Sequence, residues 1–195
     1  MIFEAHQTKY GTIRIPVPQT YKDVFILINS DIYRTIGKDS TKICILKRIL
    51  QFNVLAWFRL CQLHDVFYPI KRRIYNHVSR KRNIDMPDTT RVGCGLYIGH
   101  AMCMVINETT IIGNNVNLSQ FLNIGANKGN AAIICDGTYI APMVCMVEQV
   151  TIGPNSVVGA GAVVVKDVLP NCKVGGVPSV KISDNDTNRW NYFEL

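Results

Sequence analysis

The chain has 195 residues, of which 48% are hydrophobic and 18% are charged, and its net charge at pH 7 is +7. This length suits one domain, or one domain with a smaller companion, and the apolar fraction excludes an intrinsically disordered chain. Residues 1–83 hold 15 Lys or Arg and 5 Asp or Glu, whereas residues 84–195 hold 6 and 9. The two parts therefore differ in character, and the basic first part suggests an anionic partner.

The first part is predicted to be an extended arm followed by helices. Residues 1–20 form the arm, because their end, Ile15 to Thr20, is polar and contains proline. Residues 21–83 form a basic α-helical region, with helices expected over 23–34, 41–63 and 71–82. Pro69 is expected to break the chain before the last of these helices.

After Ile84 the chain shows a different period. Aliphatic residues recur six positions apart, with one two-residue slip before Ile106 and a longer loop at 125–133; the series is Val92, Ile98, Ile106, Ile112, Leu118, Ile124, Ile134, Ile140, Met146, Ile152, Val158 and Val164. A period of six matches neither an α-helix nor a two-sided strand. It predicts a solenoid of very short strands over 84–182, with a C-terminal tail at 183–195.

Cysteine usage and the N-terminus bear on location. The seven cysteines include no CxxC pair, which argues against a zinc ribbon or a thioredoxin-type site. Neither a signal peptide nor a run long enough to span a membrane is recognisable. We expect reduced thiols and a cytoplasmic location.

The hexads, together with the segments Gly95-Leu-Tyr-Ile-Gly-His100 and Gly176-Val-Pro-Ser-Val180, resemble the hexapeptide-repeat acyltransferases. Within them the chain is most similar to the serine acetyltransferase branch, and its short helical region resembles capsule and exopolysaccharide O-acetyltransferases. The resemblance implies a left-handed parallel β-helix, acetyl-CoA as cosubstrate, and a homotrimer whose active sites lie between subunits.

Acetyl transfer to a hydroxyl needs a base, and histidine is suited to that role at neutral pH. His100 is the only histidine in the repeat region, it lies where the hexad register slips, and it matches the catalytic position of the family. Asp85 lies fifteen residues earlier, the spacing that resembles the Asp–His dyad of the family, and would orient His100. No metal is expected, because a zinc site like that of γ-class carbonic anhydrases needs three histidines.

The acceptor side departs from the serine enzymes. Gly99 stands where they have an aspartate, and Asn130-Ala131 aligns with their Arg-His pair. A carboxylate is normally bound by arginine, so a sugar hydroxyl of a polysaccharide or its precursor is favoured as acceptor, with serine as the alternative. Asn127, Lys128 and Asn130 are the candidate acceptor residues.

For acetyl-CoA, the resemblance points to small residues beside the pantetheine arm and to lysines near the phosphates. The candidates are Gly125, Ala141, Gly159, Ala160, Lys166 and Lys181.

Two further readings remain. A non-catalytic β-helix scaffold would be expected to lack the His100 and Asp85 that are present here. The basic run 71–82 carries no nucleic-acid motif, so nucleic acid is not expected as a partner. Peripheral membrane contact is possible instead, because the helix at 43–63 combines Phe52, Trp57 and Phe58 with basic residues.

Overall fold

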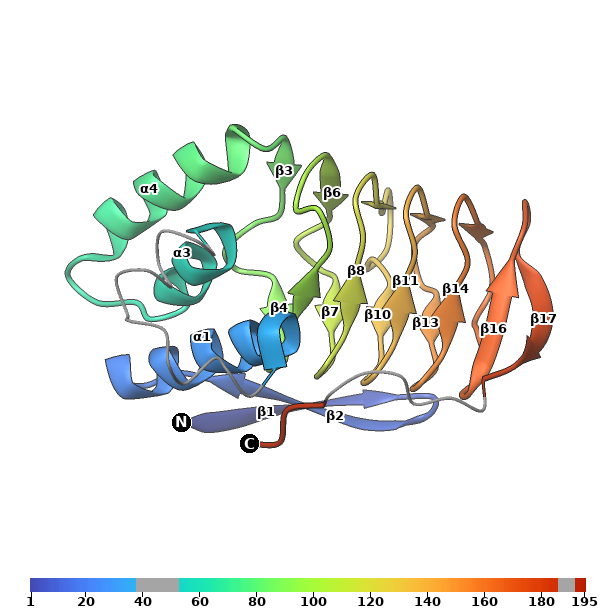
Figure 1. Ribbon diagram of the computed structural model, residues 1–195, viewed down its shortest axis with the longest axis horizontal. Coiled ribbons are helices and arrows are strands. Elements are labelled where there is room, and N and C mark those ends of the chain that lie inside the picture. The colour runs from blue at the N-terminus through green and yellow to red at the C-terminus, as the bar shows by residue number, and fades with distance from the viewer. Residues whose placement is uncertain (38–52, 186–191) are drawn as a thin grey trace.

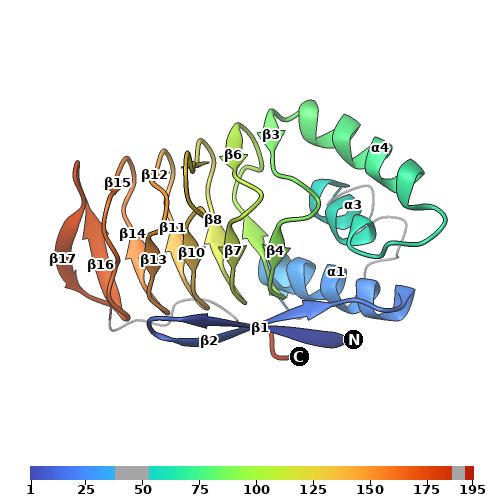
Figure 2. The same ribbon diagram turned by 180° about the vertical axis from the view of Figure 1, so that it is seen from behind.

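The computed structural model describes residues 1–37, 53–185 and 192–195. A three-sided solenoid forms most of the molecule, helices close its first coil, and an N-terminal hairpin runs along one side (Figures 1 and 2). The predicted fold class, a left-handed parallel β-helix with a small α-helical N-terminal region, is confirmed.

The solenoid strands are only two to five residues long and stack into three parallel sheets. Each is named here by its first strand. The β3 sheet holds β3 (Ile84–Asp85), β6 (Met104–Ile106), β9 (Asn123–Ile124), β12 (Cys145–Met146) and β15 (Val163–Val164). The β4 sheet holds β4 (Arg91–Val92), β7 (Ile111–Ile112), β10 (Ile133–Ile134) and β13 (Thr151–Ile152). The β5 sheet holds β5 (Tyr97–Ile98), β8 (Asn117–Leu118), β11 (Tyr139–Ile140), β14 (Val157–Val158) and β16 (Cys172–Gly175), with β17 (Val180–Asp184) antiparallel at its end.

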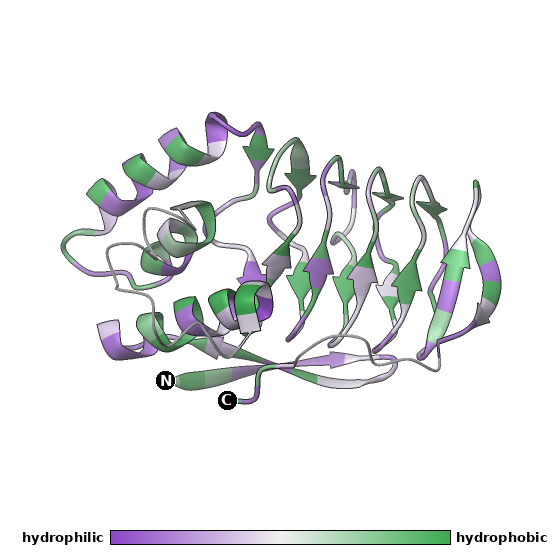
Figure 3. Cartoon of the chain, viewed as in Figure 1, coloured by the Kyte–Doolittle hydropathy of each residue, from purple (hydrophilic) through white to green (hydrophobic). Residues whose placement is uncertain are grey.

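The six-residue period is explained by what the aliphatic residues do in these strands. Each hexad residue ends its strand or lies near its end and points into the solenoid; Ile112, Leu118, Ile134 and Ile140 are fully buried. Figure 3 shows the resulting hydrophobic colouring of most solenoid strands. Because every coil covers the apolar interior of its neighbours, the core continues along the whole axis.

The N-terminal arm takes the form of an antiparallel hairpin, β1 (Ile2–Thr8) and β2 (Gly11–Val17). Its Ile13 and Ile15 are buried against Ile111, Ile133 and Cys135, on the outer face of the β4 sheet. Lys9 also pairs with Asp167 near the last coils. The hairpin therefore covers one side of the solenoid.

Three helices are described, and they differ from the expected ranges mainly at their ends. Helix α1 (Tyr21–Ile36) begins with a capping box between Thr20 and Asp23 and ends at Gly37. Helix α4 (Tyr68–Arg80) contains Pro69 in its first turn, where a proline is tolerated, instead of being preceded by a break at that residue. Of the expected 41–63 helix, the described part is α3 (Asn53–Cys61), and residues 38–52, with Phe52, lie outside the described residues.

The aromatic residues of α3 do not form the exposed face expected for membrane contact. Phe58 is fully buried and packs against Tyr75. Trp57 is half-buried, and it packs against both the solenoid core and the smaller core between α1 and α3. The prediction is therefore wrong for Phe58, which packs between the helices and the first coil, whereas Trp57 keeps part of its surface exposed.

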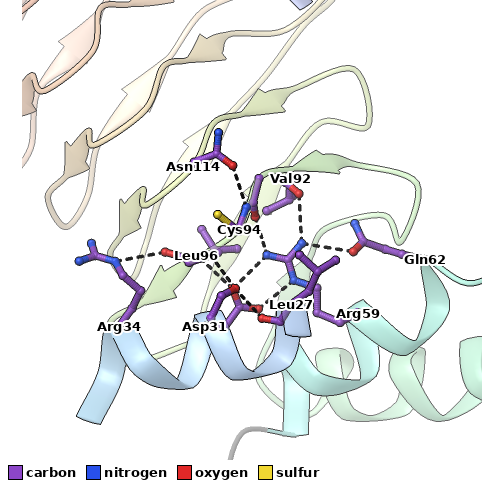
Figure 4. A network of polar contacts seen from close by, with 12 residues as sticks. Leu27, Asp31, Arg34, Arg59, Gln62, Val92, Cys94, Leu96 and Asn114 are labelled. Atoms are coloured by element: carbon purple, nitrogen blue, oxygen red, sulfur yellow. Dashed lines mark hydrogen bonds and ion pairs between the residues drawn. The ribbon is translucent and has the colours of Figure 1, made fainter. Parts of the chain in front are cut away.

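A buried polar network joins the helices to the first coil (Figure 4). Arg59 of α3 is fully buried and donates to both carboxylate oxygens of Asp31 on α1, at 2.8 and 3.0 Å. The same guanidinium donates to the carbonyls of Val92 and Gly93, while Asp31 accepts from the Leu96 N–H at 2.8 Å. Burial raises the pKa of the Asp31 carboxyl, and Arg59 opposes that rise.

The third side of the solenoid is the least covered. The β4 sheet lies under the hairpin, and the β5 sheet is met by Arg34 of α1 and by the terminal Tyr192 and Phe193. In contrast, the outward residues Asp85, Val105, Asn123 and Cys145 of the β3 sheet are all exposed. Among the described elements, none packs over these four residues.

Candidate active site

His100 lies in the turn between β5 and β6, at the edge where the β5 sheet meets the β3 sheet. The turn is two residues longer than a regular hexad turn, and His100 is exposed there with a left-handed backbone, φ 55°. The N–H of Cys103 donates to the Arg82 carbonyl at 2.8 Å, a contact that recurs at the same corner of later coils, where the N–H groups of Met143 and Gly161 donate to carbonyls of the coil before. The two extra residues therefore lie between Gly99 and Cys103, next to the exposed His100.

Three of the predicted acetyl-CoA residues follow His100 along the same edge. Strand pairing aligns Ile98 with Leu118, Leu118 with Ile140 and Ile140 with Val158, so the residues after them form two columns. One column contains His100, Gln120, Pro142 and Ala160; the other contains Gly99, Ser119, Ala141 and Gly159. The predicted Ala141, Gly159 and Ala160 thus share the His100 edge, beside a column of small residues.

Gln120 is a site residue that the sequence analysis missed. It lies in the corresponding turn of the next coil, two residues after Leu118, which pairs with Ile98, and its Oε1 is buried without a hydrogen-bond partner in the described part of the chain. An unpaired buried carbonyl oxygen is costly in a purely structural role. Grouping the hexads in threes would have identified it, since every third hexad returns to the same edge.

Asp85 ends β3 and points outward from the β3 sheet, exposed to solvent. Its strand pairs with β6, where Asp85 is aligned with Val105, five residues after His100. Within the described residues, neither a hydrogen bond nor an ion pair joins Asp85 to His100. The structure therefore brings the two residues to the same end of the solenoid without forming the dyad.

The remaining predicted residues lie at the other edge of the β3 sheet, where it meets the β4 sheet. Gly125 follows β9, Lys166 follows β15, and the 125–132 loop carries Asn127, Lys128 and Asn130. One chain therefore divides the predicted site between two edges, separated by the width of the exposed β3 sheet. Lys181 belongs to neither edge: it lies in β17 and pairs with Asp184 at 2.6 Å.

Glu148 holds the 125–132 loop in place. Its Oε2 accepts from the N–H groups of Asn127, Lys128 and Gly129 at 2.8, 2.8 and 3.0 Å. These three donors lower the pKa of the Glu148 carboxyl, because they stabilise its ionised form. The loop that carries the predicted acceptor residues is thus ordered by one carboxylate.

The hairpin brings His6 to a groove beside this loop, and β4 of the solenoid contributes Arg91 to the same groove. A groove of about 580 Å³ is lined by His6, Thr89, Arg91, Glu108, Thr109, Ile111 and Asn130. Arg91 is half exposed and lies 3.4 Å from Glu4. His6 of the hairpin and Arg91 of β4 therefore line the same groove as Asn130, although neither follows His100 in the sequence.

The described residues contain neither a candidate metal site nor a helix that could span a membrane. Among residues 1–37, 53–185 and 192–195, no group of three or more His, Cys, Asp or Glu is placed to hold a metal ion. No described helix is both long and apolar enough to cross a bilayer.

Comparisons with known proteins identify similar chains. No protein-family model matches the chain. Serine acetyltransferase 3, mitochondrial, of Arabidopsis thaliana is 29% identical over 141 residues, which cover 66% of this chain and 36% of the relative. The serine acetyltransferase of Bacillus pumilus is 28% identical over 170 residues, which cover 83% of this chain and 78% of the relative.

A solved structure agrees with these sequence relatives. The serine acetyltransferase of Neisseria gonorrhoeae, crystallised in complex with serine, has a TM-score of 0.68 and 26% identity, covering 82% of this chain and 69% of that one. The chain resembles serine acetyltransferases in both sequence and fold. The comparisons give no support to the resemblance to capsule and exopolysaccharide enzymes, and this chain spans about a third of the length of the Arabidopsis relative.

Proposed function

We propose that this protein is an O-acetyltransferase that moves acetyl from acetyl-CoA to a hydroxyl group. The observation that carries the proposal is the exposed His100 beside a column of small residues, in a fold shared with serine acetyltransferases. A scaffold of this fold would have no need for a lengthened turn that exposes a histidine.

His100 acts as the general base in the proposed reaction. Its imidazole takes the proton of the acceptor hydroxyl while that oxygen attacks the thioester carbonyl carbon. The resulting tetrahedral intermediate collapses, the carbon–sulfur bond breaks, and the proton passes to the departing CoA sulfur. Asp85, in β3 at the same end of the solenoid, would orient the imidazolium, and Gln120, in the corresponding turn of the next coil, would contact the reacting groups.

The acetyl-CoA arm would lie along the His100 edge. Ala160 is exposed and Gly159 is partly exposed, and because both are small a pantetheine chain can approach this edge beside the buried Ala141. Gly125 and Lys166, at the opposite edge, would contact the same cofactor from a neighbouring copy. Lys181 is a candidate for the CoA phosphates only if it leaves Asp184.

Serine is the first acceptor to test. The relatives are serine acetyltransferases, and the groove beside Asn130 offers Arg91 for a carboxylate and Glu108 for an ammonium group. These observations favour serine over the sugar that the sequence alone favoured. A sugar hydroxyl remains the second candidate, because Gly99 and the uncharged Asn127 and Asn130 are suited to a neutral acceptor.

We further propose a cytoplasmic homotrimer with its sites between subunits. The β3 sheet is the exposed side of the solenoid, and the two halves of the predicted site lie at its two edges. Packing around a threefold axis would place the His100 edge of one copy against the 125–132 loop of the next.

The base is tested by CoA release from acetyl-CoA, measured with a thiol reagent in the presence of serine or of a panel of nucleotide sugars. His100→Ala should lower kcat by about 10²–10⁴-fold. His77→Ala is the matched control, since His77 is exposed on α4 away from the site, and should stay within about twofold. Activity of His100→Ala close to wild type excludes this base, and absence of acceptor-dependent CoA release by the wild type excludes the transferase.

The shared site is tested by mixing two inactive variants. His100→Ala removes the base from one edge, and Asn127→Ala with Lys166→Glu alters the other edge. If the site lies between copies, refolded mixtures should regain activity that neither variant has alone, because some interfaces then contain two intact edges. Failure to regain activity in mixtures that light scattering shows to be trimers would place the whole site in one chain.

A further inference from the structure

The solvent face of α4 is a basic groove that the proposed reaction does not use. The groove has a volume of about 810 Å³ and is lined by Tyr68, Pro69, Arg72, Arg73, Asn76, His77, Arg80 and Lys81. Its lining contains no carboxylate. The opposite face of α4, with Lys71, Tyr75 and Ser79, is buried against the rest of the molecule.

The cations of α4 divide into those held by internal partners and those that remain available. Lys71 is buried, lies 2.9 Å from Asp65 and donates to the Leu63 carbonyl at 2.6 Å. Arg72 lies 3.4 Å from Asp88. In the described part of the chain, no carboxylate pairs with Arg73, Arg80 or Lys81. These three exposed charges are not needed to hold the fold together.

Large apolar side chains lie at the start of the same helix. Val66, Phe67 and Ile70 are 85%, 57% and 61% exposed. Figure 3 shows the corresponding hydrophobic colour at the turn between α3 and α4. This exposure is costly in water unless a partner covers it, and it directly adjoins the basic groove.

We propose that this α4 surface, comprising Val66, Phe67, Ile70, Arg73, Arg80 and Lys81, binds anionic phospholipid membranes peripherally. The cations complement the lipid phosphates, and the apolar tip enters the boundary between headgroups and acyl chains. A free phosphate or a nucleic acid would use the cations and leave the tip uncovered. The combination of both features on one helix therefore favours a membrane surface.

Vesicle flotation of the full chain tests the proposal without any acetyl-CoA or acceptor. Vesicles of phosphatidylcholine with about 30 mol % phosphatidylserine should bind the wild type, and pure phosphatidylcholine should bind much less. Arg73→Glu with Arg80→Glu should lower the partition coefficient by at least about 25-fold, since each cation near such a surface contributes roughly fivefold. Arg14→Glu with Lys173→Glu changes the net charge equally, away from α4, and should stay within about twofold.

A second variant distinguishes the contribution of the apolar tip to membrane binding from that of the positive charges. Phe67→Ser with Ile70→Ser should still bind at low salt, and should lose the binding that the wild type retains at high salt. Circular dichroism confirms that each variant is folded. Equal losses in the α4 and control charge variants, no binding to anionic vesicles, or vesicle binding fully displaced by a DNA duplex or inorganic phosphate at physiological salt would each overturn the proposal.

Discussion

The helical end and the solenoid are stabilised by different kinds of interaction. In the solenoid, each coil adds a few aliphatic side chains to a continuous core, and every contact has a near copy one coil away. At the helical end, one buried guanidinium connects two helices to two backbone carbonyls of the first coil. The solenoid is thus stabilised by repeated apolar contacts, whereas at the helical end a single buried ion pair adds to the apolar packing.

Replacing Arg59 with methionine should have the largest effect. The change leaves the buried Asp31 carboxylate unpaired and removes the donor from the Val92 and Gly93 carbonyls, which should cost about 3–5 kcal/mol of docking free energy. Fluorescence of Trp57, in a Trp190→Phe background, should show helical unfolding at lower denaturant than the loss of β-structure by circular dichroism. Coincident transitions in the variant would mean that the two regions do not separate.

Replacing Ile140 with alanine should have a smaller and differently distributed effect. Ile140 is fully buried in the middle of the solenoid, so the lost packing and the cavity should cost about 2–4 kcal/mol. Both probes should shift together, because the neighbouring coils share one core. Ile140→Val, expected to cost about 1 kcal/mol, is the graded control. A cost of alanine below that of valine would contradict distributed packing.

The smallest effect is expected at the start of α1. Backbone N–H groups near Gln19 and the terminal amine of Met1, 3.0 Å away, lower the pKa of Asp23 from 3.8 to about 2. A lowered acid pKa stabilises the fold above about pH 4, and this contribution disappears as the pH falls toward 2. Thermal melts across that range should therefore be less pH-dependent in Asp23→Asn, and an unchanged slope would show that other carboxylates dominate.

The contrast also explains what could be predicted from sequence. The hexads of the solenoid repeat locally, so their period, the slip at His100 and the loop at 125–133 were visible without any structure. The Asp31–Arg59 pair joins residues 28 positions apart and leaves no periodic signal. The hairpin was missed for a similar reason, since Ile13 and Ile15 are buried by coils more than ninety residues later.

Which residues belong to the candidate site could be predicted from the sequence better than how those residues lie relative to one another. His100 and the small residues Ala141 and Gly159 were identified from pattern and resemblance, and they do share one edge. Their separation from Gly125 and Lys166 depends on which of the three sheets each hexad enters. His6 reaches the groove beside the acceptor loop only through the hairpin, and Arg91 reaches it from an earlier coil of the solenoid; local sequence patterns reveal neither arrangement.

The hairpin also sets an order of events during synthesis on the ribosome. The chain emerges from its N-terminus, yet Thr8 contacts Cys135, Lys9 pairs with Asp167, and the Arg14 carbonyl accepts from Asn114. The hairpin is therefore made before the coils that bury it, and it must remain unpaired with the solenoid until most of those coils have been translated. Coil formation can proceed vectorially behind them, and docking of the hairpin then closes the finished stack from the side.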